Sequence, residues 1–234
     1  MAQYDESIAY VDDQLRQLHE RLAQAGRKQR WVVTADHGEE IGERGSWGHA
    51  HSLYAEQLRV PLIVSGEGLP EGKVVPEAVG IHDIASTIAS WVDQPMPEAD
   101  GIDLNPAMAG APVPGRAFPA ETFRFKPRRI SLYEGGKRIE WDLVRDRKEL
   151  FDSDVDMLER TNVARTDVEG VKALAQRAES IIEAAIASVD DDACVARAQA
   201  LLSEGQDLAR RGDRAGALAK YEAVRAEGRK ITDA

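Results

Sequence analysis

The sequence predicts an α/β fold that ends in a small antiparallel sheet and an α-helical tail. Near the N-terminus, apolar residues from Ile8 to Leu22 recur at intervals of three and four, which is the spacing of one helical face. The apolar run at 31–34 has the length of a short buried strand. From about 117 to 152, short alternating runs on either side of a Gly-Gly pair predict an antiparallel sheet built around a hairpin.

The other elements of the first half follow in order. Gly26 is expected to end the first helix, and a second strand is expected from Arg59 to Val64. A turn region rich in glycine and proline follows at 65–72, and the spacing then predicts a helix from about His82 to Val92. Residues 93–115 include five prolines and are expected to form a loop.

Helical spacing returns from Val168 to Ala185. The acidic run from Asp190 to Asp192 is expected to break this helix, so residues 1–190 and 194–230 are predicted to be separate domains. In the tail, Gly205 and Tyr221 are spaced as in one tetratricopeptide repeat, whose two antiparallel helices touch through small residues. A plain helical hairpin packed on the first domain is the alternative, because a stable solenoid needs about three repeats.

The chain is acidic and long enough for one substantial core. It has 234 residues, 43% of them hydrophobic, and a net charge of -11. This charge argues against a nucleic-acid partner, since no basic stripe is present to meet phosphates. No run of about 18 apolar residues occurs, and the N-terminus lacks a basic n-region and an apolar h-region, so neither a membrane span nor a signal peptide is predicted. The cellular location stays open, because an export signal would lie upstream of this chain.

The stretch from Trp31 to Val64 carries the clearest chemical signal. Asp36 and His37 directly follow the predicted strand and precede a glycine. A carboxylate beside an imidazole offers ligands for a divalent cation, and open α/β sheets bind ligands at the C-terminal ends of their strands. The alternative is structural: Asp36 caps the next segment, and His37 is an ordinary surface or core group.

Several motifs in one order resemble the sulfatase family, within the alkaline phosphatase superfamily. Residues 4–12 resemble the family helix that precedes the strand at 31–34, and residues 79–110 resemble a helix-and-loop segment of that family. The resemblance covers about residues 4–165 and implies a partial alkaline phosphatase/sulfatase-like fold, of which this chain is the C-terminal half. The motifs that carry it are Asp36-His37-Gly38-Glu39, Gly48-His49, Ser52 to Glu56, Arg59 to Ile63, and Glu149-Leu150-Phe151-Asp152 with Asp156, Glu159 and Asn162-Val163-Ala164.

The resemblance implies a metal site and a nucleophile. Asp36 and His37 match the second pair of ligands to one divalent cation, which is expected to be calcium, with magnesium, manganese or zinc as alternatives. The family nucleophile lies in a Cys/Ser-x-Pro-x-Arg motif, whose Cys or Ser becomes formylglycine, and no such motif occurs in this sequence. Formylglycine is therefore expected only in an N-terminal half that is missing here. The single Cys194 lacks the required proline and is predicted to be structural.

Two further histidines are candidate substrate contacts. His49 is predicted to protonate the leaving group or to donate a hydrogen bond to the bound anion. His51 is either a second anion contact or a solvent-facing residue. Many sulfatases have a lysine where this chain has Ala50, and that departure leaves phosphate esters open beside sulfate esters. His19 and His82 lie on helical patterns and are predicted to be structural or surface groups.

Two classes of function are consistent with these features. In the first, the chain is part of a metal-dependent hydrolase of sulfate esters, with a small molecule or a glycan as substrate, and is inactive without its nucleophile. A phosphoester hydrolase or transferase of the same superfamily is a variant of this hypothesis. In the second, the chain is a non-catalytic remnant that binds a protein partner through its helical tail. Met1 falls directly before a family helix, so a truncated gene model is favoured.

Overall fold

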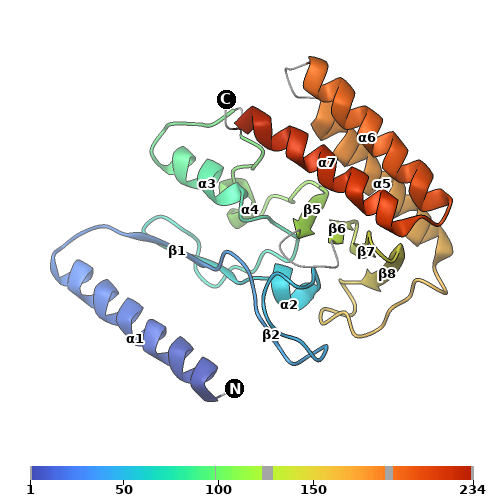
Figure 1. Cartoon of the computed structure of the whole chain (residues 1–234). Coiled ribbons are helices and arrows are strands. Elements are labelled where there is room, and N and C mark those ends of the chain that lie inside the picture. The colour runs from blue at the N-terminus through green and yellow to red at the C-terminus, as the bar shows by residue number, and fades with distance from the viewer. Residues whose placement is uncertain (1, 98, 123–128, 188–191, 233–234) are drawn as a thin grey trace. The chain divides into compact units, whose positions relative to one another are not determined.

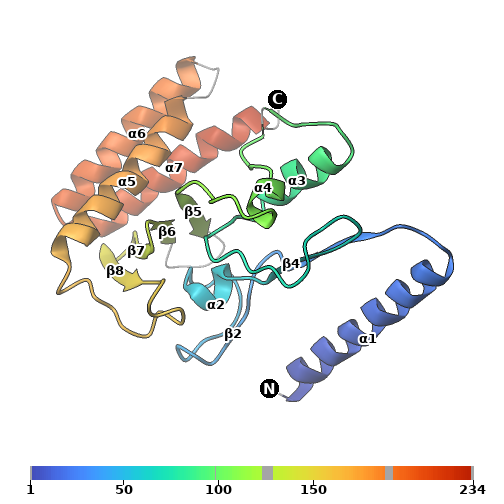
Figure 2. The same cartoon turned by 180° about the vertical axis from the view of Figure 1, so that it is seen from behind.

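The computed structural model describes residues 2–97, 99–122, 129–187 and 192–232 (Figure 1; Figure 2). The chain forms two compact units. The N-terminal unit comprises Met1–Gly48 and Arg59–Gly115, and the C-terminal unit comprises His49–Leu58 and Arg116–Ala234. The short segment His49–Leu58 therefore belongs to the C-terminal unit, although it interrupts the sequence of the N-terminal one.

The N-terminal unit contains two small antiparallel sheets and three helices. The first sheet pairs β1 with β4, with Val32 opposite Val64, and the second is the hairpin of β2 and β3. The first helix, the first strand and the helix that follows His82 are confirmed. The elements are α1 (Ala2–Gln24), β1 (Arg30–Thr34), β2 (Glu40–Ile41), β3 (Trp47–Gly48), β4 (Leu62–Gly66), α3 (Asp83–Trp91) and α4 (Asn105–Met108).

The second strand of this unit begins later than expected. β4 starts at Leu62 and not at Arg59. Pro61 has no N–H to donate to a neighbouring strand, so the ladder begins only after it. As expected, Asp36 and His37 lie just beyond the C-terminal end of β1, which stops at Thr34.

The loop expected at 93–115 contains the short helix α4. A proline lies in its first turn, where a missing N–H costs little. Two buried side chains of α3 bind the backbone of the segment that precedes α4. Asp83 accepts a hydrogen bond from the Ile102 N–H at 2.9 Å, and the Thr87 hydroxyl accepts one from the Leu104 N–H at 3.0 Å. These contacts replace water on the loop backbone and so order a proline-rich stretch.

The C-terminal unit is built on a four-stranded antiparallel sheet in the order β5-β6-β7-β8. The predicted hairpin turn is confirmed: Gly135 and Gly136 join β6 to β7 with φ of 60° and 81°, values that favour glycine. The helices of this unit are α2 (Ala55–Leu58), α5 (Val168–Ala187), α6 (Asp192–Arg210) and α7 (Arg214–Thr232), and its strands are β5 (Phe118–Thr122), β6 (Arg129–Glu134), β7 (Lys137–Asp142) and β8 (Arg147–Asp152).

The two faces of this sheet differ in chemistry. One face packs against α5 and forms an apolar core, with Leu132, Ile139 and Leu150 almost fully buried against Leu174 and Ala178. Because side chains alternate along a strand, residues between these positions point to the opposite face. That second face carries polar side chains such as Ser131, Glu140 and Glu149, which are also buried.

The tail is a helical hairpin of α6 and α7 (Figure 1). Asp213 begins α7 by accepting a hydrogen bond from the Gly216 N–H at 3.0 Å. Gly205 lets the two helices approach closely, since a Cβ there would lie 2.9 Å from the Tyr221 ring. The predicted boundary near Asp190 and the side chain of Cys194 lie outside the described residues. Among the helices that the structure describes, none is long and apolar enough to cross a membrane.

Enlarging Gly205 is expected to loosen this hairpin. Gly205→Val places a branched side chain against the Tyr221 ring and is expected to destabilise the tail by about 1 to 3 kcal/mol through overpacking. Thermal unfolding followed by circular dichroism measures the change. The double variant Gly205→Val/Tyr221→Ala removes the obstructing ring and should recover part of the loss. Equal losses in the single and double variants would show that Gly205 and Tyr221 do not touch.

Candidate functional site

Asp36 and His37 occupy the turn that follows β1. The Asp36 Oδ1 atom accepts a hydrogen bond from the His37 backbone N–H at 3.0 Å. The His37 Nδ1 atom lies 2.8 Å from the Gly38 carbonyl oxygen, and because a carbonyl only accepts, this contact favours the tautomer with the proton on Nδ1. This tautomer leaves the lone pair on Nε2, as in metal-binding histidines whose other nitrogen donates to a carbonyl. The Asp36 Oδ2 atom lies 3.7 Å from that Nε2.

The hairpin of β2 and β3 follows this turn. Glu40 pairs with Gly48, so Glu39 directly precedes one strand of the hairpin and His49 directly follows the other. Within the described part of the chain, the side chains of His37 and Glu39 lie close enough to share one metal ion. The Glu39 carboxylate is therefore a candidate ligand beside Asp36 and His37.

His49 and His51 flank a strained residue in the C-terminal unit. Ala50 has φ of 67°, a left-handed conformation that residues with a Cβ rarely adopt. Its N–H donates to Gln57 Oε1 at 3.2 Å, and its carbonyl accepts from the Thr122 hydroxyl at 3.0 Å. Both bonding side chains are buried, whereas His49 and His51 are exposed.

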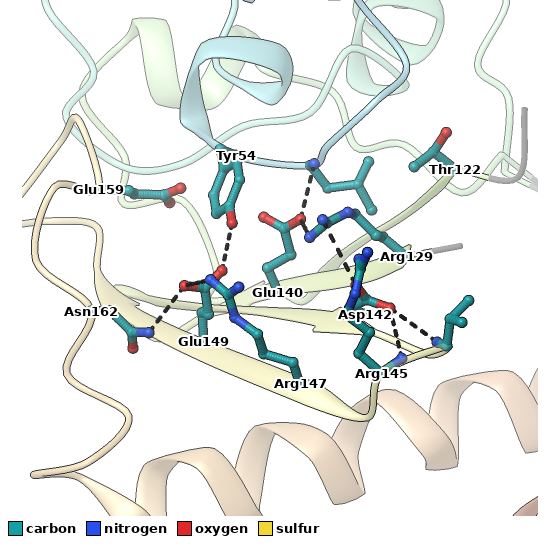
Figure 3. A network of polar contacts seen from close by, with 12 residues as sticks. Tyr54, Thr122, Arg129, Glu140, Asp142, Arg145, Arg147, Glu149, Glu159 and Asn162 are labelled. Atoms are coloured by element: carbon teal, nitrogen blue, oxygen red, sulfur yellow. Dashed lines mark hydrogen bonds and ion pairs between the residues drawn. The ribbon is translucent and has the colours of Figure 1, made fainter. Parts of the chain in front are cut away.

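Three consecutive residues after this turn are bound by three buried glutamates (Figure 3). The Leu53 N–H donates to Glu140 Oε1 at 3.5 Å, and the Ala55 N–H donates to Glu159 Oε2 at 2.9 Å. Between them, the Tyr54 hydroxyl donates a short hydrogen bond to Glu149. Tyr54 is buried and also packs edge-on against Phe151.

Each of these glutamates also pairs with an arginine. Arg129 Nη1 lies 2.6 Å from Glu140, Arg138 Nε lies 2.6 Å from Glu159, and Arg147 Nη2 lies 2.7 Å from Glu149. Burial alone would raise the pKa of Glu149, but the Tyr54 hydroxyl and Arg147 outweigh it and lower that pKa. The pKa of Tyr54 rises because the phenol is buried beside the negative charges of Glu140 and Glu149.

Glu140 differs from the other two glutamates. Burial raises its pKa to about 7, although Arg129 favours the ionised form. Among the residues that the structure describes, only its Oε1 atom has partners, since the buried Oε2 atom has none of them within hydrogen-bonding distance. A carboxylate with one unsolvated oxygen holds its proton more tightly, so this geometry supports the direction of the shift.

The pKa of Glu140 makes stability fall as pH rises. In the unfolded chain a glutamate releases its proton near pH 4.5, whereas in the folded chain Glu140 holds it to about pH 7. The folded state therefore binds more protons between these values, and up to about 3 kcal/mol of stability is lost from pH 4.5 to 7. Urea unfolding across this range measures the slope. Glu140→Gln should flatten it, and equal slopes in the two proteins would contradict the assignment.

The C-terminal signature attaches the next segment to β8. The Asn162 side-chain oxygen accepts hydrogen bonds from the backbone N–H groups of Leu150 at 3.1 Å and Ala164 at 3.0 Å. Its amide nitrogen donates to Glu149 at 3.2 Å. Asn162 thus fixes both the backbone of β8 and the glutamate that holds Tyr54.

The other two histidines lie on or directly before a helix. His82 precedes α3, and its Nε2 lies 3.6 Å from the buried Asp83. His19 is on α1 with its ring 5.7 Å from that of Trp31. The roles predicted for Asp36, His37, His49 and His51 remain predictions.

Part of this sequence matches a known family. Residues 1–94 match the sulfatase family model. Over 77 residues, 31% of this chain and 19% of the relative, it is 40% identical to the low-salt glycan biosynthesis sulfotransferase Agl7 of Haloferax volcanii. Over 169 residues, 69% of this chain and 32% of the relative, it is 27% identical to the choline-sulfatase of Rhizobium meliloti. The chain thus spans only part of these relatives.

Solved structures show the same fold. BT4656, in complex with its substrate D-glucosamine-2-N,6-O-disulfate, superimposes with a TM-score of 0.59 at 21% identity, over 74% of this chain and 38% of that one. BT1596, a 2-O GAG sulfatase, gives a TM-score of 0.56 at 24% identity, over 70% and 37%. The chain therefore has part of the alkaline phosphatase-like fold of the sulfatases, and its first 94 residues match the sulfatase family.

Proposed function

We propose that this chain is part of a metal-dependent sulfatase-type hydrolase that acts on sulfate ester bonds. One observation carries the proposal: the Asp36-His37 turn after β1, with its imidazole in the tautomer suited to metal binding, lies in the stretch that matches the sulfatase family. The sulfatase fold of the chain is consistent with this function.

Asp36 and His37 are the proposed metal ligands, and Glu39 is a third candidate. The donor set combines carboxylate oxygens with an imidazole nitrogen. The carboxylate oxygens suit calcium, whereas the imidazole suits manganese or zinc better. A bound cation would neutralise charge on the ester oxygens. The protein's own task is to present these ligands in one geometry, which the His37 contact with Gly38 supports.

His49 and His51 are the proposed contacts to the substrate anion. Both are exposed and lie on either side of the strained Ala50. A protonated imidazole at 49 can donate a hydrogen bond to an ester oxygen and pass its proton to the leaving group. Ala50 brings no positive charge, so phosphate esters are the alternative substrates of the same machinery.

The proposed substrate class is a sulfated glycan or a small sulfate ester. BT4656 binds a glucosamine disulfate, and one curated relative is a choline-sulfatase. Formylglycine would come from sequence outside these 234 residues, as would the remaining metal ligands. The chain alone is therefore proposed to be inactive, as the C-terminal half of a catalytic domain.

A second proposal concerns the tail. The close contact of Gly205 with Tyr221 is consistent with a tetratricopeptide-like hairpin. In a non-catalytic remnant, this hairpin would bind a protein partner. Pulldowns with the whole chain and with a chain that ends at Asp190 distinguish the two: the same partners from both would remove this proposal.

Metal binding tests the main proposal. Manganese is expected to broaden the NMR signals of the His37 ring and to leave those of His19 and His82 unchanged, because only nearby nuclei relax. Affinity should be weak, since part of the ligand set is absent. Asp36→Asn should reduce the broadening, with Asp12→Asn on α1 as the matched control. Equal broadening in both variants, or submicromolar calcium binding by the chain alone, would contradict the proposed site.

A further inference from the structure

We propose that Gln57 and Thr122 are positioning residues that hold the His49-Ala50-His51 turn in place for anion binding. The inference rests on the proposed role of the two histidines, but no sequence motif points to it. Gln57 lies on α2 and Thr122 on β5, and both side chains bond the backbone of Ala50.

The anchor of this arrangement is the polar face of the C-terminal sheet. Glu140 and Glu149, which face each other on β7 and β8, hold Leu53 and Tyr54, and Glu159 holds Ala55. Figure 3 shows Glu140 and Glu149 beneath the segment that carries Tyr54. Because each glutamate is itself paired with an arginine, its position is fixed from two sides.

The anchored segment places Gln57. Ala55 is the first residue of α2, so the bond from its N–H to Glu159 fixes the start of that helix. Gln57 follows two residues later and is only 4% exposed. A buried amide in a short, anchored helix has few alternative rotamers, so its oxygen is a fixed acceptor for the Ala50 N–H.

The turn needs such support because it is strained. A non-glycine residue in the left-handed region costs about 1 kcal/mol or more, and such residues persist only where their surroundings hold them. Gln57 satisfies the N–H of Ala50 and Thr122 satisfies its carbonyl, so both backbone groups of the strained residue are bonded. The backbone that carries the exposed imidazoles of His49 and His51 is thereby held in one conformation, which reduces the conformational entropy lost when they bind an anion.

Two matched pairs of variants test the inference in the whole chain. Thr122→Val keeps the shape but removes the hydroxyl, and Thr122→Ser keeps the hydroxyl. Gln57→Leu removes the acceptor, and Gln57→Glu keeps one. The readouts are the ring NMR signals of His49 and His51 and hydrogen exchange of the Ala50 amide, measured without metal or sulfate. Because neither readout needs a bound metal or anion, a negative result here would count against the positioning role of Gln57 and Thr122 and would leave the proposed metal site untouched.

The valine and leucine variants are expected to shift or broaden both rings, with His19 and His82 unchanged. Exchange at Ala50 should quicken about tenfold in the leucine variant, as for loss of one hydrogen bond of about 1.4 kcal/mol. The serine and glutamate variants should restore the native signals. If the valine or leucine variant unfolds, Ala50→Gly, which loosens the turn without touching the core, replaces it and should broaden the same rings. Unchanged rings in the folded variants would overturn the inference.

Discussion

Replacing Glu159 by alanine is expected to destabilise the C-terminal unit by about 3 to 5 kcal/mol, because removing one partner of a buried ion pair leaves the other uncompensated. The Glu159 carboxylate is fully buried and lies 2.6 Å from Arg138, which is itself only 11% exposed. The change would also leave the Ala55 N–H and the Ser153 hydroxyl without their carboxylate acceptor. Urea unfolding and amide exchange along β7 measure the loss.

Two controls separate the buried contacts from the loss of a charge. Glu183→Ala removes an exposed carboxylate from α5 and should change stability by less than about 0.5 kcal/mol. Glu159→Gln keeps the shape and one acceptor oxygen, so its effect should be smaller than that of alanine. A loss below about 1 kcal/mol in Glu159→Ala would mean that Arg138 finds another partner or water.

The local elements of the fold are predictable because their signals are local. The Gly135-Gly136 turn needs only residues that accept positive φ, and the helix from Val168 needs only apolar residues on one face. The apolar run places the start of β4 too early, because it does not reveal that Pro61 interrupts the ladder. Local sequence patterns therefore predict whether a segment is a helix or a strand better than they predict the residue at which it begins.

The contacts that hold the candidate site are not local, and no pattern near the site predicts them. Leu53 and Glu140 are 87 residues apart in sequence, and Ala55 and Glu159 are 104 apart. Alternation along β7 could have shown that the side chain of Glu140 points away from the face that carries Ile139 and the apolar core. It could not have shown which segment that glutamate meets. The support that Gln57 and Thr122 give to Ala50 appears only once the chain is folded.

The candidate ligands can be found from sequence because an Asp-His pair after a strand is a compact signal. The geometry of the pair is not predictable: the tautomer of His37 follows from a contact with the Gly38 carbonyl. Nothing local in the sequence indicates that the Glu39 carboxylate lies near the His37 imidazole, because that depends on how the turn after β1 folds.

The largest expected effect on function is the absence of turnover by this chain alone. It is expected to hydrolyse aryl sulfates and aryl phosphates near the background rate with calcium, magnesium, manganese or zinc. The sequence has no Cys/Ser-x-Pro-x-Arg motif, so no nucleophile of that kind is held in line with the ester. Positioning of reacting groups supplies about 7 to 11 kcal/mol of barrier reduction, which polarisation by a cation and an imidazole does not replace.

The decisive comparison is with a longer reading frame that includes such a motif. If upstream sequence supplies it, the extended protein should turn over sulfate esters, and Asp36→Ala should reduce kcat/KM about a thousandfold, as for loss of a charge-stabilising group. Asp12→Ala on α1 is the matched control and should leave the rate unchanged. Metal-dependent turnover by the 234-residue chain itself would contradict this prediction. It would mean that the chain holds its own nucleophile near Asp36 and His37, among residues that have no proposed catalytic role.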